Sequence, residues 1–92
     1  SGFMPDRIDL AQNYPNPFNP ATVIEFTLPE KAEVSLVVYD LLGNEVATLQ
    51  EGPLDAGHHN VSWKGANSSA GIYIYRLQSL GVTETKKMIL LK

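Results

Sequence analysis

Cysteine is absent from this 92-residue chain. The sequence therefore offers no disulfide framework, no thiolate metal site and no thiol nucleophile. Long hydrophobic runs are also missing: no apolar stretch approaches the roughly 20 residues that a membrane-spanning helix needs, and no signal peptide is recognisable. If the protein is exported, its leader is expected upstream of this sequence. No segment shows helical periodicity beyond two turns, which excludes a mainly α-helical fold.

An excess of positive charge is missing too. The net charge is −3, with ten acidic side chains against seven lysines and arginines. Residues 1–85 carry ten acids and four basic side chains (−10 + 4 = −6), and residues 86–92 carry three lysines (+3). Because nucleic-acid binding needs a concentrated basic face, no nucleic-acid partner is expected. The composition, 43% hydrophobic and 18% charged, is that of a folded globular protein.

Short segments of alternating apolar and polar residues recur along the chain, about 8–12 residues apart, with turn residues between them. This pattern predicts an all-β fold, an immunoglobulin-like antiparallel β-sandwich of about seven strands. The length fits one domain, with residues 1–4 as a linker or expression remnant and residues 5–92 as a single unit, expected to be monomeric. The predicted strands are 22–28, 33–40, 45–50, 58–64, 71–79 and 82–91, with a further pairing around 8–10.

One strand departs from simple alternation. In 45–50 the apolar residues Val46 and Leu49 are three positions apart, which predicts a bulge or a short edge strand. The following residues, 51–57, contain two glycines and a proline and are predicted to form a loop.

The C-terminal part is expected to be a hairpin of 71–79 and 82–91 around Leu80-Gly81. The last strand ends in four consecutive apolar residues, so both of its faces are expected to be covered. Lys86 and Lys87 either keep an exposed edge strand soluble or take part in recognition; both interpretations remain open.

Residues 12–20, Gln-Asn-Tyr-Pro-Asn-Pro-Phe-Asn-Pro, are the most informative stretch. Proline fixes φ, removes an amide donor and keeps the residue before it extended. We therefore expect a stiff, non-helical strap that leads into the strand at 22–28. Phe18 is predicted to be buried against the sandwich, and the asparagines are predicted to bond nearby backbone groups.

Candidate catalytic and metal-binding residues are few. His58 and His59 are adjacent, and neighbouring side chains of a strand point to opposite faces, so they are not expected to share a metal ion. The Ser68-Ser69 pair lies in a predicted loop without a nearby acid or histidine. The spacing of Asp6 and Asp9 is unspecific. No enzyme, metal site or cofactor is predicted.

Two further residues have competing interpretations. Asp40 precedes a turn at 41–44 and is expected to cap it through backbone amides rather than to bind calcium. Trp63 could stack on a sugar, but it shares a strand face with Val61, which favours a core position. Tyr14 and Tyr39 are better candidates for exposed aromatic side chains.

The order of several motifs resembles one family, the C-terminal sorting domain (type A) of proteins exported by the bacterial type IX secretion system. This family is related in sequence to the immunoglobulin-like domain of flagellar hook-capping proteins. Hook-capping relatives carry Trp-Asp-Gly and a longer loop before Gly-x-Tyr; here Lys64 follows the tryptophan and only seven residues separate Trp63 from Gly71, which favours the sorting domain. The motif residues, expected to be structural, are Asn16, Pro17, Phe18, Asn19, Pro20, Leu28, Pro29, Tyr39, Asp40, Gly43, Gly57, Trp63, Gly71 and Tyr73.

The resemblance implies a signal rather than a catalyst. A larger exported protein would carry the domain at its C-terminal side, and the domain would direct passage across the outer membrane, followed by cleavage or anchoring at the cell surface. The implied partners are an outer-membrane translocon, a shuttle protein, a surface sortase and the N-terminal cargo domain. The end strand would offer its last residues for another protein to pair with. The candidate signal residues are Lys86, Lys87, Met88, Ile89, Leu90, Leu91 and Lys92.

Two other functions remain open from the sequence. One is a carbohydrate-binding or adhesive β-sandwich that accompanies a secreted hydrolase. The other is a structural spacer of immunoglobulin type. A binding module is expected to show glycan affinity in isolation and to lose it when one exposed aromatic side chain is removed.

Overall fold

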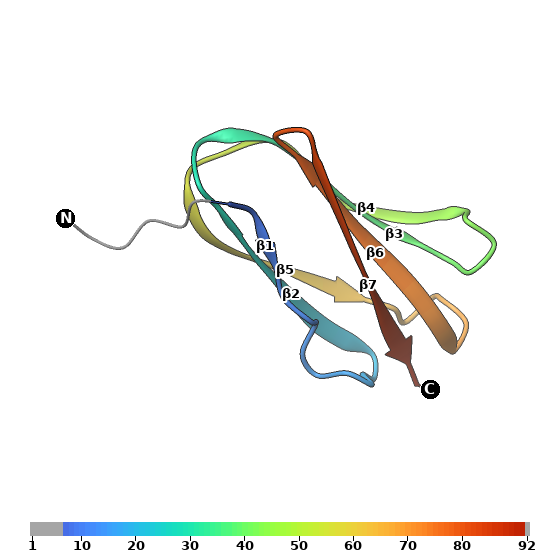
Figure 1. Ribbon diagram of the computed structural model, residues 1–92. Coiled ribbons are helices and arrows are strands. Elements are labelled where there is room, and N and C mark those ends of the chain that lie inside the picture. Colours follow the sequence, from blue (N-terminus) through green and yellow to red (C-terminus); the bar gives the residue numbers. More distant parts are fainter. Residues whose placement is uncertain (1–6, 92) are drawn as a thin grey trace.

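The computed structural model describes residues 7–91, which form two antiparallel β-sheets packed face to face (Figure 1). One sheet has the strand order β1-β2-β5 and the other the order β4-β3-β6-β7. The part of the chain that the structure describes contains no helix long and apolar enough to cross a membrane. The strands are β1 (Asp9–Leu10), β2 (Ala21–Leu28), β3 (Ala32–Tyr39), β4 (Glu45–Leu54), β5 (Gly57–Lys64), β6 (Gly71–Ser79) and β7 (Val82–Leu90).

The core lies between the sheets and follows the predicted alternation. In β6, Tyr73, Tyr75 and Leu77 are buried, and the residues between them face outward. Strand β2 places Ile24 and Phe26 in the same core from the opposite sheet. The strands therefore form where apolar side chains at every second position can be buried on one face. This confirms the predicted all-β sandwich.

Strand β4 is longer than predicted. It continues to Leu54, so the predicted loop over 51–57 is wrong for most of its length. Gly52 and Pro53 are tolerated because β4 is an edge strand, where an amide that points outward is not needed for pairing. The register against β3 shifts twice, which leaves Leu49 and Val46 as the extra residues. The bulge predicted from their spacing is thus confirmed.

Strand β7 is covered on one face only, contrary to the prediction that both faces would be covered. Met88 and Leu90 are buried in the core, whereas Ile89 and Leu91 are 39% and 49% exposed. The reason is topological. Strand β7 is the last strand of its sheet, and no second layer of the described residues covers the outer face of that sheet.

The hairpin of β6 and β7 forms around Leu80 and Gly81, as predicted. Both turn residues have positive φ, 53° and 75°, which is the conformation of a type I′ turn. This turn matches the twist of the flanking strands. It aligns nine residue pairs, from Ser79 with Val82 to Gly71 with Leu90.

A tyrosine at the start of β6 supports the immunoglobulin-like assignment. The hydroxyl of Tyr73 donates a hydrogen bond of 2.6 Å to the carbonyl of Ser69, four residues earlier. A tyrosine bonded in this way to the backbone upstream of its strand is a hallmark of immunoglobulin-like sandwiches.

Trp63 lies in the core, as predicted. It is 7% exposed, and its ring packs against Phe18 and Tyr73 with centroid distances of 5.7 and 5.4 Å. The indole ring therefore belongs to the contact between the two sheets. It is not available as a platform for sugars.

Replacing Trp63 by alanine is expected to lower the free energy of unfolding by roughly 3–5 kcal/mol, because a large aromatic side chain leaves a cavity. In a domain of this size such a loss lowers the Tm by more than about 10 °C. Trp63→Phe, which retains a ring, serves as the control and loses much less. Thermal unfolding followed by circular dichroism measures both; an unchanged Tm in Trp63→Ala contradicts the core role.

Candidate recognition site at the C-terminal strand

The strap, residues 12–20, crosses from one sheet to the other. At its start, Tyr14 exchanges two backbone hydrogen bonds of 3.0 Å with Val23 of β2. Further on, the amide of Phe18 donates to the carbonyl of Ile89 at 2.9 Å, and the amide of Leu91 donates to the carbonyl of Phe18 at 2.8 Å. All three of its X-Pro peptide bonds are cis. The strap therefore links β2 of one sheet to β7 of the other.

Phe18 holds the strap against the sandwich. Its side chain is 1% exposed and contacts Trp63, and its backbone forms a parallel bridge with Leu90. The predicted burial of Phe18 is confirmed. Full burial of an aromatic ring supplies the free energy that keeps a proline-rich segment docked.

A buried hydroxyl group fixes the start of the strap. The Tyr75 hydroxyl donates to the carbonyl of Ala11 at 2.7 Å and accepts a hydrogen bond from the amide of Asn13 at 2.8 Å. Burial of this hydroxyl raises the pKa of Tyr75 to about 12. Tyr75 belongs to β6, so this contact joins the strap to the middle of the four-stranded sheet.

The side chain of Asn13 completes the attachment. It is buried, and its Nδ2 donates to the carbonyl of Pro15 at 3.2 Å and to Oγ1 of Thr22 at 3.0 Å. Asn16 Oδ1 accepts the amide of Ile89 at 2.9 Å. The prediction that asparagines bond backbone groups is thus confirmed for these two. The Asn19 side chain is exposed and has no hydrogen bond among residues 7–91, so for Asn19 the prediction is wrong.

The strap covers the outer edge of β7 over its C-terminal half. Besides the bonds to Phe18 and Asn16, the carbonyl of Lys87 accepts a hydrogen bond of 2.7 Å from Nε2 of Gln12. The edge groups from Lys87 to Leu91 are therefore occupied. The expected presentation of the last residues as a free strand for pairing is not what the structure shows. The part of β7 near Thr83 and Thr85 has no neighbouring strand on this side within the described chain.

The candidate signal residues do not form one patch. Lys86, Met88 and Leu90 point toward the core side of β7, where Met88 and Leu90 are buried and Lys86 is half-buried. Lys87 and Ile89 lie on the outer face together with Leu91, and all three are exposed. Lys92 lies outside the described residues. The two adjacent lysines are therefore directed to opposite faces of the sheet.

The side chain of Leu90 packs closely against Gly65. A Cβ atom placed on Gly65 would lie 2.7 Å from Cδ2 of Leu90, closer than non-bonded carbon atoms approach. The amide of Gly65 also donates to the carbonyl of Pro20 at 2.8 Å, at the end of the strap. Gly65 thus supports both the last strand and the strap.

The other candidates from the sequence form no reactive site. His58 Nδ1 is 3.0 Å from Oγ1 of Thr27, and His59 Nε2 is 2.7 Å from the carbonyl of Asp55. Over residues 7–91 no group of His, Cys, Asp and Glu side chains could hold a metal ion. The pair of Asp6 and Asp9 includes a residue outside the described part.

Asp40 caps its turn as predicted. Its Oδ1 accepts the amides of Leu42 and Asn44, each at 2.9 Å. The hydrogen bond from the Asn44 amide is the main cause that lowers the pKa of Asp40. The carboxylate is therefore committed to the backbone of its own turn.

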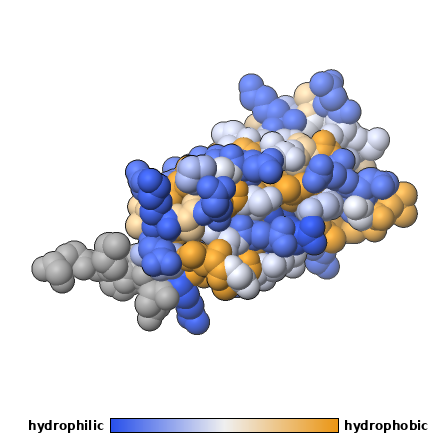
Figure 2. Space-filling model, turned by 90° about the horizontal axis from the view of Figure 1, so that it is seen from above, coloured by the Kyte–Doolittle hydropathy of each residue, from blue (hydrophilic) through white to orange (hydrophobic). Residues whose placement is uncertain are grey.

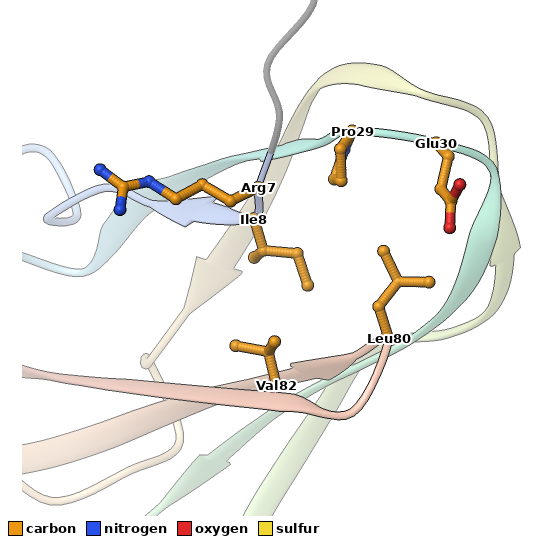
Figure 3. Close-up of a pocket in the computed structure, with 6 residues that line it drawn as sticks. All are labelled: Arg7, Ile8, Pro29, Glu30, Leu80 and Val82. Carbon is orange, nitrogen blue, oxygen red and sulfur yellow. The ribbon is translucent and has the colours of Figure 1, made fainter.

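A shallow hollow of about 320 Å³ lies at the end of the sandwich where the chain enters. Figure 3 shows the side chains of Ile8, Leu80 and Val82 pointing into it, whereas the guanidinium group of Arg7 points away. Seen from above the view of Figure 1, the hydrophobic side chains form several separate patches among hydrophilic ones (Figure 2). The hollow contains no pair of titratable groups arranged for catalysis.

Comparison with known families gives a match over residues 12–91, from the first residue of the strap to the residue after β7, and the matching family is described as the secretion system C-terminal sorting domain. The chain belongs to this family. Domains of this family are the sorting signals of type IX secretion, which mark proteins for export to the cell surface or the extracellular space. A sorting domain of this kind is not itself a catalyst.

The sorting domain is also similar to part of a solved structure, dimeric latent PorU from Porphyromonas gingivalis. The TM-score is 0.66 with 20% sequence identity, over 98% of this chain and 10% of that chain. The sorting domain thus spans about a tenth of the length of PorU, and at this identity the similarity shows the fold alone. A comparison with curated proteins found no match.

Three residues that organise the site were not singled out from the sequence: Gln12, Tyr75 and Gly65. The alternation groups Tyr75 with Tyr73 and Leu77 on one face of the strand, and the structure buries this face. Nothing in the spacing identifies Ala11 and Asn13, more than 60 positions away, as the partners of its hydroxyl group. The contact of Gly65 with Leu90 likewise depends on packing between distant segments.

Replacing Tyr75 by phenylalanine is expected to cost about 1–3 kcal/mol at neutral pH, because the amide of Asn13 and the carbonyl of Ala11 lose a buried partner. The pKa of Tyr75 is raised in the folded state, so its contribution is fully present below the unfolded value of about 10 and is lost as pH rises toward about 12. The difference between wild type and variant should therefore shrink over that range. Urea unfolding at neutral and alkaline pH measures it, with the exposed Tyr14→Phe as control; a constant difference contradicts this role.

Gly65→Ala is expected to destabilise the domain by about 1–3 kcal/mol through overpacking against Leu90. The added methyl group needs the space that the Leu90 side chain fills. In Gly65→Ala combined with Leu90→Ala, the loss should be smaller than the sum of the two single losses. Urea unfolding of the three variants gives the coupling free energy, and strictly additive losses mean that the two residues do not compete for space.

Proposed function

We propose that this sorting domain is recognised through the outward row of β7, the side chains of Lys87, Ile89 and Leu91. The main support for this proposal is that these side chains are exposed, whereas the strap occupies the backbone hydrogen-bonding groups beside them. A partner that binds the folded domain here therefore contacts side chains and not a free strand edge. Lys86 and Lys92 add charge to the same end of the chain.

The partners in this proposal are the components that carry the domain across the outer membrane: a translocon, a shuttle protein and a surface sortase. The cargo is the part of the polypeptide that precedes the domain. The domain contributes no chemistry of its own, and its fate after transport is cleavage or anchoring at the cell surface. The domain is weakly acidic over most of its sequence and basic at its C-terminal end, so a partner can distinguish the two by charge.

No observation favours the alternative of a carbohydrate-binding module. Trp63 is buried, and Tyr39 is stacked against Arg76. Tyr14 is 81% exposed, but it is a single aromatic side chain on a proline-rich segment. Sugar-binding surfaces need an accessible aromatic platform with polar groups placed around it.

Export of a reporter tests the proposal. Residues 5–92 are fused to a periplasmic reporter in a host that has this secretion system, and Lys86, Lys87 and Lys92 are replaced together by glutamine. Glutamine keeps much of the length of the lysine side chain, and substitutions of exposed residues usually change stability by no more than about 0.5 kcal/mol. The variant is therefore expected to stay folded and to accumulate in the periplasm, while the wild-type fusion reaches the cell surface or the medium.

The matched control replaces Lys31 and Lys64, which are exposed and belong to other segments than β7, by glutamine. This control removes positive charge but should be exported normally. Normal export of the triple variant would mean that the lysines act in solubility alone. Periplasmic retention of the control as well would mean that overall charge, and not the β7 row, is sensed.

A further inference from the structure

The outer face of the four-stranded sheet continues the exposed row of β7 onto β6 and β3. In the register of the sheet, Ile72 lies opposite Ile89, Ile74 opposite Lys87, and Arg76 opposite Thr85. On the other side of β6, Ile74 and Arg76 lie opposite Tyr39 and Val37 of β3. The face thus places two cationic side chains beside a group of isoleucines. We call the set Tyr39, Ile72, Ile74, Arg76, Lys87 and Ile89 the outer-face cluster.

Arg76 has an unusual environment in this cluster. Its guanidinium carbon lies 4.5 Å from the centroid of the Tyr39 ring, and one Nη donates a hydrogen bond to the Tyr39 hydroxyl group. Its Nε is buried and has no hydrogen-bond partner among the described residues. Stacking on the ring holds the planar group in one orientation, with donors left over.

The charges of Arg76 and Lys87 are not compensated from within the described chain. No ion pair of Arg76 or Lys87 is found over residues 7–91, and Nε of Arg76 has no hydrogen-bond partner there either. The acid nearest to Arg76 along the wall of the adjoining hollow is Asp40, whose carboxylate is held by the amides of Leu42 and Asn44. Two uncompensated cations on one face are notable in a chain with a net charge of −3.

The space beside Arg76 can accept a side chain. A hollow of about 280 Å³ is lined by Tyr39, Asp40, Leu41, Gly43, Ile74, Arg76 and Thr85. Its walls are partly apolar, and Arg76 supplies hydrogen-bond donors to it. A carboxylate is the group that fits such donors best, because it accepts the bidentate hydrogen bonds of a guanidinium group.

We propose that the outer-face cluster is a docking surface for a segment of another protein in which acidic and apolar side chains alternate on one side. Carboxylates engage Arg76 and Lys87, and apolar side chains rest on Ile72, Ile74 and Ile89. This inference rests on the proposed function. It adds residues of β6 and β3 to the recognition surface and specifies acidic and apolar side chains on the partner. Because the strap occupies the edge of β7 near Ile89, this partner lies across the face of the sheet and does not add a strand.

A titration with a defined probe tests the chemistry independently of export. The probe is the extended peptide acetyl-Glu-Ser-Leu-Ser-Glu-Ser-Leu-amide, and the control peptide has glutamine in place of both glutamates. We expect the backbone amide signals of β6 and β7 near Ile74 and Lys87 to shift in nuclear magnetic resonance spectra, and those of β5 to stay unchanged. Equal binding of the glutamine peptide, or shifts confined to other strands, overturns the proposal.

Variants of the domain sharpen this test. Arg76→Gln and Lys87→Gln should each weaken peptide binding, with a loss of roughly 10- to 100-fold for Arg76→Gln, the range for a hydrogen bond to a charged group. Arg76→Lys keeps the charge but loses the planar fork, so it should bind less well than wild type and better than Arg76→Gln. Lys64→Gln on β5 is the matched control and should bind like wild type. The Tm of each variant shows that it is folded.

The same variants in the reporter fusion separate this inference from the proposed function. If the wild-type domain is exported and Arg76→Gln is retained in the periplasm although folded, the docking surface is supported. If both are exported equally, the surface is not used and the inference is overturned, while the sorting role stands. If the wild-type fusion itself is not exported, the proposed function fails, and the peptide titration decides the docking surface alone. Binding of the domain to vesicles of anionic phospholipid that is lost in Arg76→Gln would assign the surface to a membrane and overturn a protein partner.

Discussion

The buried hydroxyl group of Tyr75 is the contact on which the arrangement of the C-terminal strand depends. It takes both a donor and an acceptor from the backbone at Ala11 and Asn13, and so fixes where the strap starts beside β2. From that point the proline-rich chain can reach β7 with Phe18 in the core. A hydroxyl group removed from water without partners is costly, so this position of the strap is strongly preferred over others. The close packing of Leu90 against Gly65 further holds β7 in this arrangement.

Much of the fold could be predicted because it depends on local patterns. The alternation in β6 indicated which side chains share a face, and the spacing of Val46 and Leu49 indicated a bulge or a short edge strand in β4, where the structure has two register shifts. The errors have physical reasons. Gly52 and Pro53 suggest a loop, but an edge strand tolerates both residues. The apolar run that ends β7 suggests burial on two faces, but the position of a strand within its sheet depends on long-range pairing.

The candidate site was only partly predictable for the same reason. The sequence shows a basic, apolar end and a proline-rich stretch, but not that Gln12 and Asn16 bond the backbone of β7. Strand alternation implies that Lys86 and Lys87 point to opposite faces of the sheet. It does not show which of the two faces is exposed. As a single basic residue in the sequence, Arg76 indicates no function. Its significance comes from the ring of Tyr39 beneath it and from the missing acidic partner.

The strap and the bulges of β4 together affect how the edges of the four-stranded sheet can pair with other chains. The four-stranded sheet has two borders, β4 and β7. Two bulges and Pro53 interrupt the hydrogen-bonding groups of the first, and the strap takes up those of the second from Lys87 onward. At these borders of the four-stranded sheet, copies of the domain therefore find less regular backbone to pair with, and edge-to-edge pairing is how β-proteins begin to aggregate.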